Sequence, residues 1–175
     1  MNINWMLKST YYKMVEELNR CKRQLEDCMP EQINQAFETG GGWHDNPSWE
    51  CALNEQVKLN LRCTELNGAL AAAMFIDDLK IVGNRVSLGT EVLTKDLDTD
   101  KEEIFVILGS NDIIYNLSFL NENSPDKTFI SCISPIAGSI LKKSVQKKVV
   151  IRLPFSTQRL LILDIKPFIF NKGCC

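Results

Sequence analysis

The sequence predicts an α+β protein in which an N-terminal antiparallel coiled-coil helical hairpin is followed by an antiparallel β domain. Three observations support this fold class. Apolar residues recur at helical spacing through the first part of the chain, glycine and proline interrupt that pattern near its middle, and short β-branched runs replace it after residue 78. The 175 residues suffice for one ordinary domain or two small ones. We expect a hairpin over residues 1–78, with its tip near residues 40–48, and a second domain over residues 79–175.

The first arm of the hairpin is predicted from a stripe of apolar residues. Their spacings alternate between four and three, which places them on one face of a helix. Pro30 interrupts this arm, so we expect a kink or a break of register there. The stripe consists of Met14, Leu18, Cys21, Leu25 and Cys28.

The second arm shows the same rhythm, and breakers separate it from the first. Glycines at 40–42 and the pair Asn46-Pro47 end one helix and begin the next, with Asn46 as N-cap and Pro47 at the first helical position. Two helices of nearly equal length joined by a short turn pack antiparallel, and an arm of about 28 residues is roughly 42 Å long. The second stripe consists of Leu59, Cys63, Leu66, Leu70 and Ala73, and Gln56, Ala52 and Trp49 extend it backwards.

The remainder of the chain is predicted as strands with one short helix. Runs rich in β-branched residues are bounded by Gly, Asn, Asp, Pro or Ser. Residues 134–141 are typical of one or two helical turns, and residues 110–127, which are rich in asparagine, predict a long surface excursion. The expected strands span residues 85–92, 103–108, 129–133, 149–153 and 159–165.

Composition excludes several classes of protein. The chain is 45% hydrophobic with a net charge of −2, and it has no 18-residue apolar window and no basic start followed by an apolar run at residues 1–10. We therefore expect a cytoplasmic protein with no membrane partner. The seven cysteines form no CxxC pair and His44 is the only histidine, so we predict no structural zinc. We also expect no cofactor of the protein's own.

Charge is segregated along the chain. Residues 24–55 hold seven acids and no lysine or arginine, whereas residues 127–175 hold nine bases and the single acid Asp164. Such a pattern suits a protein that presents an acidic element to one place and a basic face to another.

Several motifs resemble the Gre family of bacterial transcript-cleavage and elongation factors. Residues 11–18, Tyr-Tyr-Lys-Met-Val-Glu-Glu-Leu, are similar to the family's opening helix, and Met-Pro-Glu at 29–31 stands where Gre proteins carry Arg-Pro-Glu. Residues 104–109 are similar to a strand end of the second domain. The most specific match is residues 130–137, Ile-Ser-Cys-Ile-Ser-Pro-Ile-Ala, against the family's Ile-Ser-Val-x-Ser-Pro-Ile-Ala.

The resemblance implies an FKBP-like second domain and a role at RNA polymerase. In the family, that domain grips the outside of the polymerase while the arm enters the secondary channel and brings tip carboxylates to the catalytic Mg²⁺. A hard cation takes oxygen ligands, so an added carboxylate can hold a second metal and orient the water that hydrolyses backtracked RNA. The factor would be an accessory to the polymerase active site and not an enzyme.

The tip departs from the family pattern. Gre tips read Gly-Asp-Leu-x-Glu-Asn, and residues 41–46 read Gly-Gly-Trp-His-Asp-Asn. Asp45 therefore stands at the Glu position as the predicted catalytic carboxylate, binding metal only in complex with the polymerase. Asn46 matches and is assigned to tip geometry, while Gly42 replaces the first acid. His44 is a weaker catalytic candidate, which either donates a hydrogen bond or acts as an acid or base near pH 7, or lies exposed without taking part in proton transfer.

Further candidates are assigned to polymerase binding. Trp43 either packs against the polymerase or folds back over the loop. Ser134 and Pro135 match the turn with which the family contacts the polymerase rim, and Ser134 is equally suited to cap the next helical turn. The lysines of the basic segment face nascent RNA or polymerase, or simply solvent; they are Lys142, Lys143, Lys147 and Lys148.

Three functional hypotheses follow. The first is a Gre-like regulator that stimulates cleavage of backtracked RNA, with the alternative of a non-cleaving homologue that occupies the channel and inhibits or competes with other channel-binding factors. The second is a peptidyl-prolyl isomerase or chaperone, against which the lack of an evident aromatic pocket argues. The third is a scaffold hairpin unrelated to polymerase.

Overall fold

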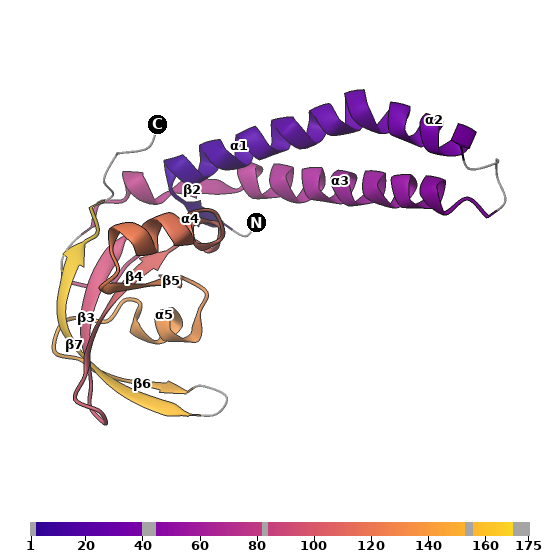
Figure 1. Ribbon diagram of the computed structural model, residues 1–175. Helices are drawn as coiled ribbons and strands as arrows, with labels where there is room; N and C mark the ends of the chain where they lie inside the picture. The colour runs from indigo at the N-terminus through magenta and orange to yellow at the C-terminus, as the bar shows by residue number, and fades with distance from the viewer. Residues whose placement is uncertain (1–2, 40–44, 82–83, 153–155, 170–175) are drawn as a thin grey trace. The chain divides into compact units, whose positions relative to one another are not determined.

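The computed structural model describes residues 3–39, 45–81, 84–152 and 156–169. The chain divides into two compact units (Figure 1). One unit contains Tyr11–Ala73, and the other combines Ile3–Thr10 with Met74–Cys175. The first unit is a helical hairpin and the second is built on a β-sheet, so the predicted α+β class is confirmed. The start of the chain, which we had assigned to the hairpin, belongs to the second unit.

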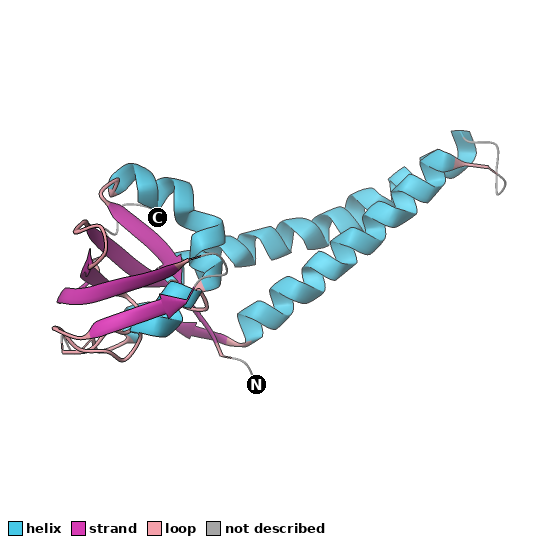
Figure 2. Cartoon of the chain, turned by 90° about the horizontal axis from the view of Figure 1, so that it is seen from below, coloured by secondary structure: helices cyan, strands magenta, loops and turns pink. Residues whose placement is uncertain are grey.

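The hairpin consists of two antiparallel helical arms (Figures 1 and 2). The first arm runs through α1 (Lys8–Arg23), the π-helical segment η1 (Gln24–Cys28) and α2 (Met29–Thr39), and the second arm is α3 (Pro47–Ala71). At 1.5 Å per residue, the 25 residues of α3 span about 38 Å. Cys63 and Leu66 of the predicted second stripe are buried. Within the described ranges, no helix combines the length and the apolarity that a membrane crossing requires.

The irregularity expected at Pro30 is a π-helical turn that precedes the proline. The Met29 amide donates to the Gln24 carbonyl, five residues back, which defines the wider turn. Pro30 lacks the amide that a regular helix would direct at Glu26, so widening the turn removes that conflict. The insertion shifts the buried face by one residue. Met29 is 2% exposed, whereas Cys28, which we had placed on the buried stripe, is exposed.

The second unit begins with an N-terminal strand that the sequence did not reveal. Strand β1 (Asn4–Met6) pairs with β2 (Ala73–Phe75) in a two-stranded sheet, and the 3₁₀ turn η2 (Ile76–Asp78) follows. The start of α1 is capped by carboxylates from distant positions, because the Leu7 amide donates to Asp112 and the Lys8 amide to Asp77. Both contacts are internal to the second unit, and they hold its first residues in place.

Five strands form the main sheet in the order β5-β4-β3-β7-β6 (Figure 1). All neighbours are antiparallel except β4 and β5, which are parallel. The expectation of a purely antiparallel sheet was therefore wrong at one edge. The strands are β3 (Thr90–Asp96), β4 (Glu102–Leu108), β5 (Lys127–Ser131), β6 (Lys148–Arg152) and β7 (Thr157–Pro167).

The parallel pair explains a second correction. Parallel strands need a crossover, usually a helix, and the segment that we had expected as a surface excursion is α4 (Ser110–Asn123). Asp112 in its first turn is fully buried and accepts hydrogen bonds from the Gly109 amide at 3.0 Å, the Leu7 amide at 2.9 Å and the Thr10 hydroxyl at 2.5 Å. Burial raises the pKa of Asp112, and these hydrogen bonds oppose that shift.

Helices cover both faces of the sheet. Helix α5 (Pro135–Ile140), expected as a short helix, packs on one face with Ala137 and Ile140 in the larger core, and α4 covers the other face with Leu120. The strand expected at residues 85–92 begins only at Thr90, because Gly89 adopts a positive φ of 76°. A Cβ atom at Gly89 would lie 2.9 Å from Ile76 Cγ2, so this turn requires glycine.

Candidate functional site

Asn46 holds the end of the hairpin together. Its Oδ1 accepts the Trp49 amide at 3.1 Å, which is the predicted N-cap of α3, and Pro47 occupies the first helical position. Its Nδ2 donates to the Ala36 carbonyl of α2 at 2.9 Å. The Asn46 side chain thus connects the last turn of one arm to the first turn of the other, and the residue is only 3% exposed.

Aromatic packing closes the same end of the hairpin. Trp49 meets Phe37 of α2 edge to face, with ring centroids 6.2 Å apart and an interplanar angle of 65°. Trp49 therefore begins the seam between the arms, as its place at the head of the second stripe indicates. An aromatic pair of this geometry adds about 1 kcal/mol beyond burial alone.

Asp45 precedes this anchor directly and is exposed. Its backbone has a positive φ of 54°, a conformation that Asp and Asn adopt more readily than other residues with side chains. Among the described residues, its carboxylate has no hydrogen bond or ion pair. The carboxylate is thus presented to solvent from a backbone that the buried Asn46 fixes on one side.

Most acids in the half of the hairpin nearest the tip are uncompensated in charge. Arg62 bonds Glu17 and Glu65 towards the other end of the hairpin, and Lys58 pairs with Glu55 near the middle of α3. Six tip-ward acids have no ion pair among the residues that the structure describes. They are Glu26, Asp27, Glu31, Glu38, Asp45 and Glu50.

The described residues do not form a metal site of their own. Across residues 3–39, 45–81, 84–152 and 156–169, no three His, Cys, Asp or Glu side chains come together in a way that could hold a metal ion. Asp45 would supply one carboxylate to a metal held elsewhere. The tip candidates Gly42, Trp43 and His44 lie outside the described residues.

A second candidate surface is the turn between β5 and α5. Ser134 caps α5, because its Oγ accepts the Ala137 amide at 3.1 Å, and Pro135 is exposed at the first helical position. The preceding Ile133 is 80% exposed. Ser134 is half-buried and its oxygen is engaged in the cap, so the most exposed surfaces of this turn are the apolar side chains of Ile133 and Pro135.

The second unit also contains a polar pocket of about 400 Å³ at one end of the sheet. Leu160 is its one apolar residue and no aromatic residue lines it, which does not suit the apolar proline ring that an isomerase must hold. The other lining residues are Thr94, Asp96, Thr99, Lys101, Glu102, Glu103 and Gln158.

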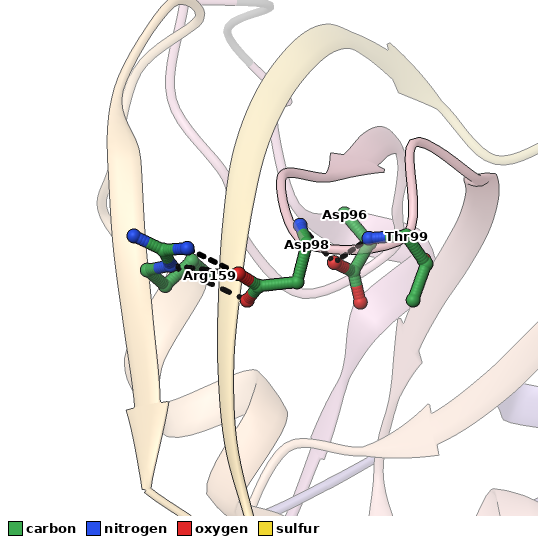
Figure 3. Close-up of polar contacts among 4 residues, drawn as sticks. All are labelled: Asp96, Asp98, Thr99 and Arg159. Atoms are coloured by element: carbon green, nitrogen blue, oxygen red, sulfur yellow. Dashed lines mark hydrogen bonds and ion pairs between the residues drawn. The ribbon is translucent and has the colours of Figure 1, made fainter.

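The turn from β3 to β4 beside this pocket is fixed by polar contacts (Figure 3). Asp96 Oδ1 accepts the amides of Asp98 at 2.7 Å and Thr99 at 3.1 Å, and Asp98 in turn accepts a two-pronged hydrogen bond from Arg159 of β7. The bond from Arg159 lowers the pKa of Asp98. These residues have a structural role, because Arg159 and Asp98 compensate each other's charge and Asp96 binds the amides of the turn.

Sequence reasoning missed the structural residues that join distant segments. Asp112, Thr10 and Asn116 form a buried chain of hydrogen bonds, with Asn116 Nδ2 donating to the Thr10 hydroxyl at 2.8 Å. No local pattern marks such a network, because Thr10 is about a hundred residues away from Asp112 and Asn116 in sequence. The burial of Met29, by contrast, could have been predicted from the sequence. Met29, Ile33 and Ala36 repeat the four-three spacing, one residue out of step with the stripe of α1.

The comparison with protein families matches residues 81–167 to the C-terminal domain of transcription elongation factors GreA and GreB. Among curated proteins, the transcription elongation factor GreA of Chloroherpeton thalassium is 30% identical over 162 residues, which cover 93% of this chain and 96% of that protein. The GreA of Helicobacter pylori strain Shi470 is 32% identical over 165 residues and 94% of both chains.

Among solved structures, the GreA factor homolog 1 (Gfh1) of Thermus thermophilus is similar, with 17% identity and a TM-score of 0.39 over 94% of this chain and 99% of that one. A second Gfh1 structure gives 18% identity and a TM-score of 0.40. The sequence relationship carries the assignment, since it covers nearly the whole length of both proteins at 30% identity or more. This chain belongs to the GreA/GreB family of transcription elongation factors.

Proposed function

We propose that this protein binds RNA polymerase in the cytoplasm, inserts its hairpin tip into the secondary channel, and stimulates cleavage of backtracked RNA through Asp45. Members of its family are accessory factors and not enzymes. The hydrolysis itself belongs to the polymerase, whose Mg²⁺ the tip would reach.

One observation carries the proposal. Asp45 is an exposed carboxylate without a partner among the described residues, and it stands directly before a buried asparagine that ties the two arms together. Presenting a solvent-exposed charge from an anchored backbone lowers the entropy lost when that charge engages a ligand. A structural role alone would not require the charge to be exposed at the end of the hairpin.

The chemistry requires an oxygen ligand at the polymerase metal. A second Mg²⁺ held there would supply Lewis-acid chemistry, activating a water molecule and balancing the charge of the phosphate. Asp45 would contribute one carboxylate to that metal or accept a hydrogen bond from the attacking water. The uncompensated acids of the tip half would favour entry into a basic channel by electrostatic attraction.

The turn at Ile133, Ser134 and Pro135 is our proposed contact with the outside of the polymerase. Its most exposed side chains are apolar, and a single apolar side chain can contribute strongly to the free energy of binding when a partner covers it. Ser134 would act indirectly, by holding Pro135 at the start of α5.

Transcript cleavage in stalled elongation complexes tests the catalytic proposal. Asp45→Ala should lower the rate of RNA shortening at least about tenfold. This corresponds to raising the activation free energy by about 1.4 kcal/mol or more, because the metal loses a ligand. Polymerase binding should persist. Glu38→Ala, a neighbouring exposed acid, serves as the matched control and should retain cleavage. Strong cleavage by Asp45→Ala would refute the assignment of the tip.

A second candidate function is occupation of the channel without cleavage. It is favoured by Gly42, which replaces one of the two carboxylates that the family pattern carries at the tip. A lone carboxylate chelates a cation more weakly than a pair. The same assay tests this alternative. It would be established if the wild-type protein cleaves nothing but competes with a cleaving factor, and if Gly42→Asp gains cleavage.

A further inference from the structure

We propose that the turn after α5 and strand β6 form a binding surface for the phosphate backbone of single-stranded nucleic acid. We call it the basic surface and define it by Arg85, Lys142, Lys143, Lys147, Lys148 and Arg152, all of which are exposed. It lies wholly within the second unit and is independent of Asp45 and of the tip.

The bases of this surface differ from other bases of the same unit. Lys95, Lys127, Arg159 and Lys166 each form an ion pair with a carboxylate of the unit. Among the residues that the structure describes, none of the six bases of the basic surface is paired with an acid. The sequence explains this, because no Asp or Glu occurs between Asp126 and Asp164 or in residues 84–89. The basic surface therefore has a positive electrostatic potential, which attracts a polyanion.

The backbone beneath these side chains is firmly held. Val86 exchanges two hydrogen bonds of 2.8 Å with the turn, donating to the Lys143 carbonyl and accepting from the Lys142 amide, which places Arg85 beside them. At the other end, Ile162 donates to the Lys147 carbonyl at 3.0 Å and accepts from the Gln146 amide at 2.8 Å. The turn is therefore fixed to two separate segments, and the lysines project from an ordered backbone.

The same turn contains two strained residues. Lys142 and Gln146 have positive φ angles of 64° and 65°, conformations that glycine would adopt without cost. Such strain persists only where the surrounding structure imposes it, and it concentrates at functional positions. Here the strained residues lie in the first lysine pair and directly before the second, and glycine at position 142 would allow the same backbone path but carry no charge.

Strand β6 extends the row of charge. It is an edge strand whose residues alternate between exposed and buried, so Lys148, Val150 and Arg152 share the outward face. Lys148 and Arg152 are four residues apart, so they are separated by roughly 13.6 Å along the strand. These two bases extend the charge of the turn along the direction of β6, as contact with separate phosphates of an extended strand requires.

The composition of the surface favours nucleic acid over an acidic protein. A stable protein interface has an apolar centre with charges at its rim. Among the described residues of this surface, Val150 is the only large hydrophobic side chain that is substantially exposed. Lysines act as point charges without the geometric demands of a specific partner, so we expect binding without sequence preference.

Fluorescence anisotropy with a labelled single-stranded RNA of mixed sequence tests this proposal on the full-length protein alone. Binding should weaken as the salt concentration rises. If the protein contacts five phosphates, a plot of log affinity against log salt concentration should have a slope of roughly −3.5. Lys147→Gln combined with Lys148→Gln should weaken binding and reduce the slope by about 1.4. Circular dichroism should remain unchanged, since both side chains are exposed.

Lys95→Gln combined with Lys166→Gln is the matched control, because it removes the same charge from two paired bases of the same sheet. This control should bind RNA within about twofold of wild type. Equal losses in the two variants, or a salt slope near zero, would overturn the proposal. Tighter binding of poly-glutamate than of RNA through the same lysines would also overturn it and assign the surface to an acidic protein. Because polymerase is absent, none of these outcomes depends on the proposed cleavage function.

Discussion

At the hairpin tip, two adjacent residues have separate tasks. Asn46 is buried and bonds both arms, so its amide is committed to structure. Asp45 is exposed with an uncommitted carboxylate, so it is available to a partner. The sequence allowed the cap to be predicted, because Asn followed by Pro is a typical helix start. The bond from Asn46 to Ala36 could not be predicted, since it depends on how the two arms are aligned.

A residue-scale prediction concerns the pair Asp98 and Arg159. The hydrogen bond from Arg159 holds the pKa of Asp98 below its ordinary value, so the pair stabilises the fold at neutral pH. This contribution is lost as pH falls through the lowered pKa of Asp98, because the protonated acid no longer attracts the guanidinium. Arg159→Gln should raise the pKa of Asp98 towards its ordinary value, as measured by carboxyl ¹³C chemical shifts in an NMR titration.

Asp164, which lies in β7 together with Arg159, provides the control. Its pKa is also lowered, mainly by the hydrogen bond from Lys166, and this pair is separate from Arg159. The Asp164 titration should therefore be the same in wild type and in Arg159→Gln. An unchanged Asp98 titration in that variant would show that Arg159 does not cause the shift.

At the scale of elements, the π-helical turn in the first arm decides which residues face the seam. Without it, continuation of the α1 stripe would bury Cys28 and then bring Gln32 and Gln35 inward. With it, Met29, Ile33 and Ala36 face inward while both glutamines are exposed. The inserted residue thus reconciles two apolar patterns that are out of step by one position.

This register makes opposite predictions for two neighbouring residues. Met29→Ala should lower the free energy of unfolding by about 2 to 4 kcal/mol, because it leaves a cavity at a residue that is 2% exposed. Cys28→Ala should change it by less than about 0.5 kcal/mol, as is usual for an exposed site. Urea unfolding followed by circular dichroism measures both values. A larger loss for Cys28→Ala would mean that the helix continues without the π turn.

Other elements show where sequence patterns fail. Helix α4 was missed because its asparagines are poor helix formers, and its stability comes from burial of Leu120 and from Asp112 binding the Leu7 and Gly109 amides. The parallel pairing of β5 was missed for the same reason, since an expected loop gives no crossover helix. Tertiary contacts override local propensity in both cases.

For the whole molecule, the sequence allowed the helical hairpin, the sheet-containing part and the family to be predicted. Periodicity predicted the two structural parts, because a helical pattern runs to about residue 78 and β-branched runs follow it, and the motif at residues 130–137 carried the family resemblance. The tip carboxylate and the basic segment were also visible as charge. What could not be predicted was which bases are paired with acids, since Lys127 and Lys166 lie in the same basic stretch as the unpaired lysines.

The central claim is that the hairpin tip reaches the metal of the polymerase active site. The most direct test replaces the catalytic Mg²⁺ of a stalled elongation complex with Fe²⁺ and generates hydroxyl radicals at that position. We predict that the radicals cut this protein near residue 45 and leave strands β3 to β7 intact. Cuts confined to the sheet-containing unit, or no cut in a protein that is bound to the complex, would contradict the account.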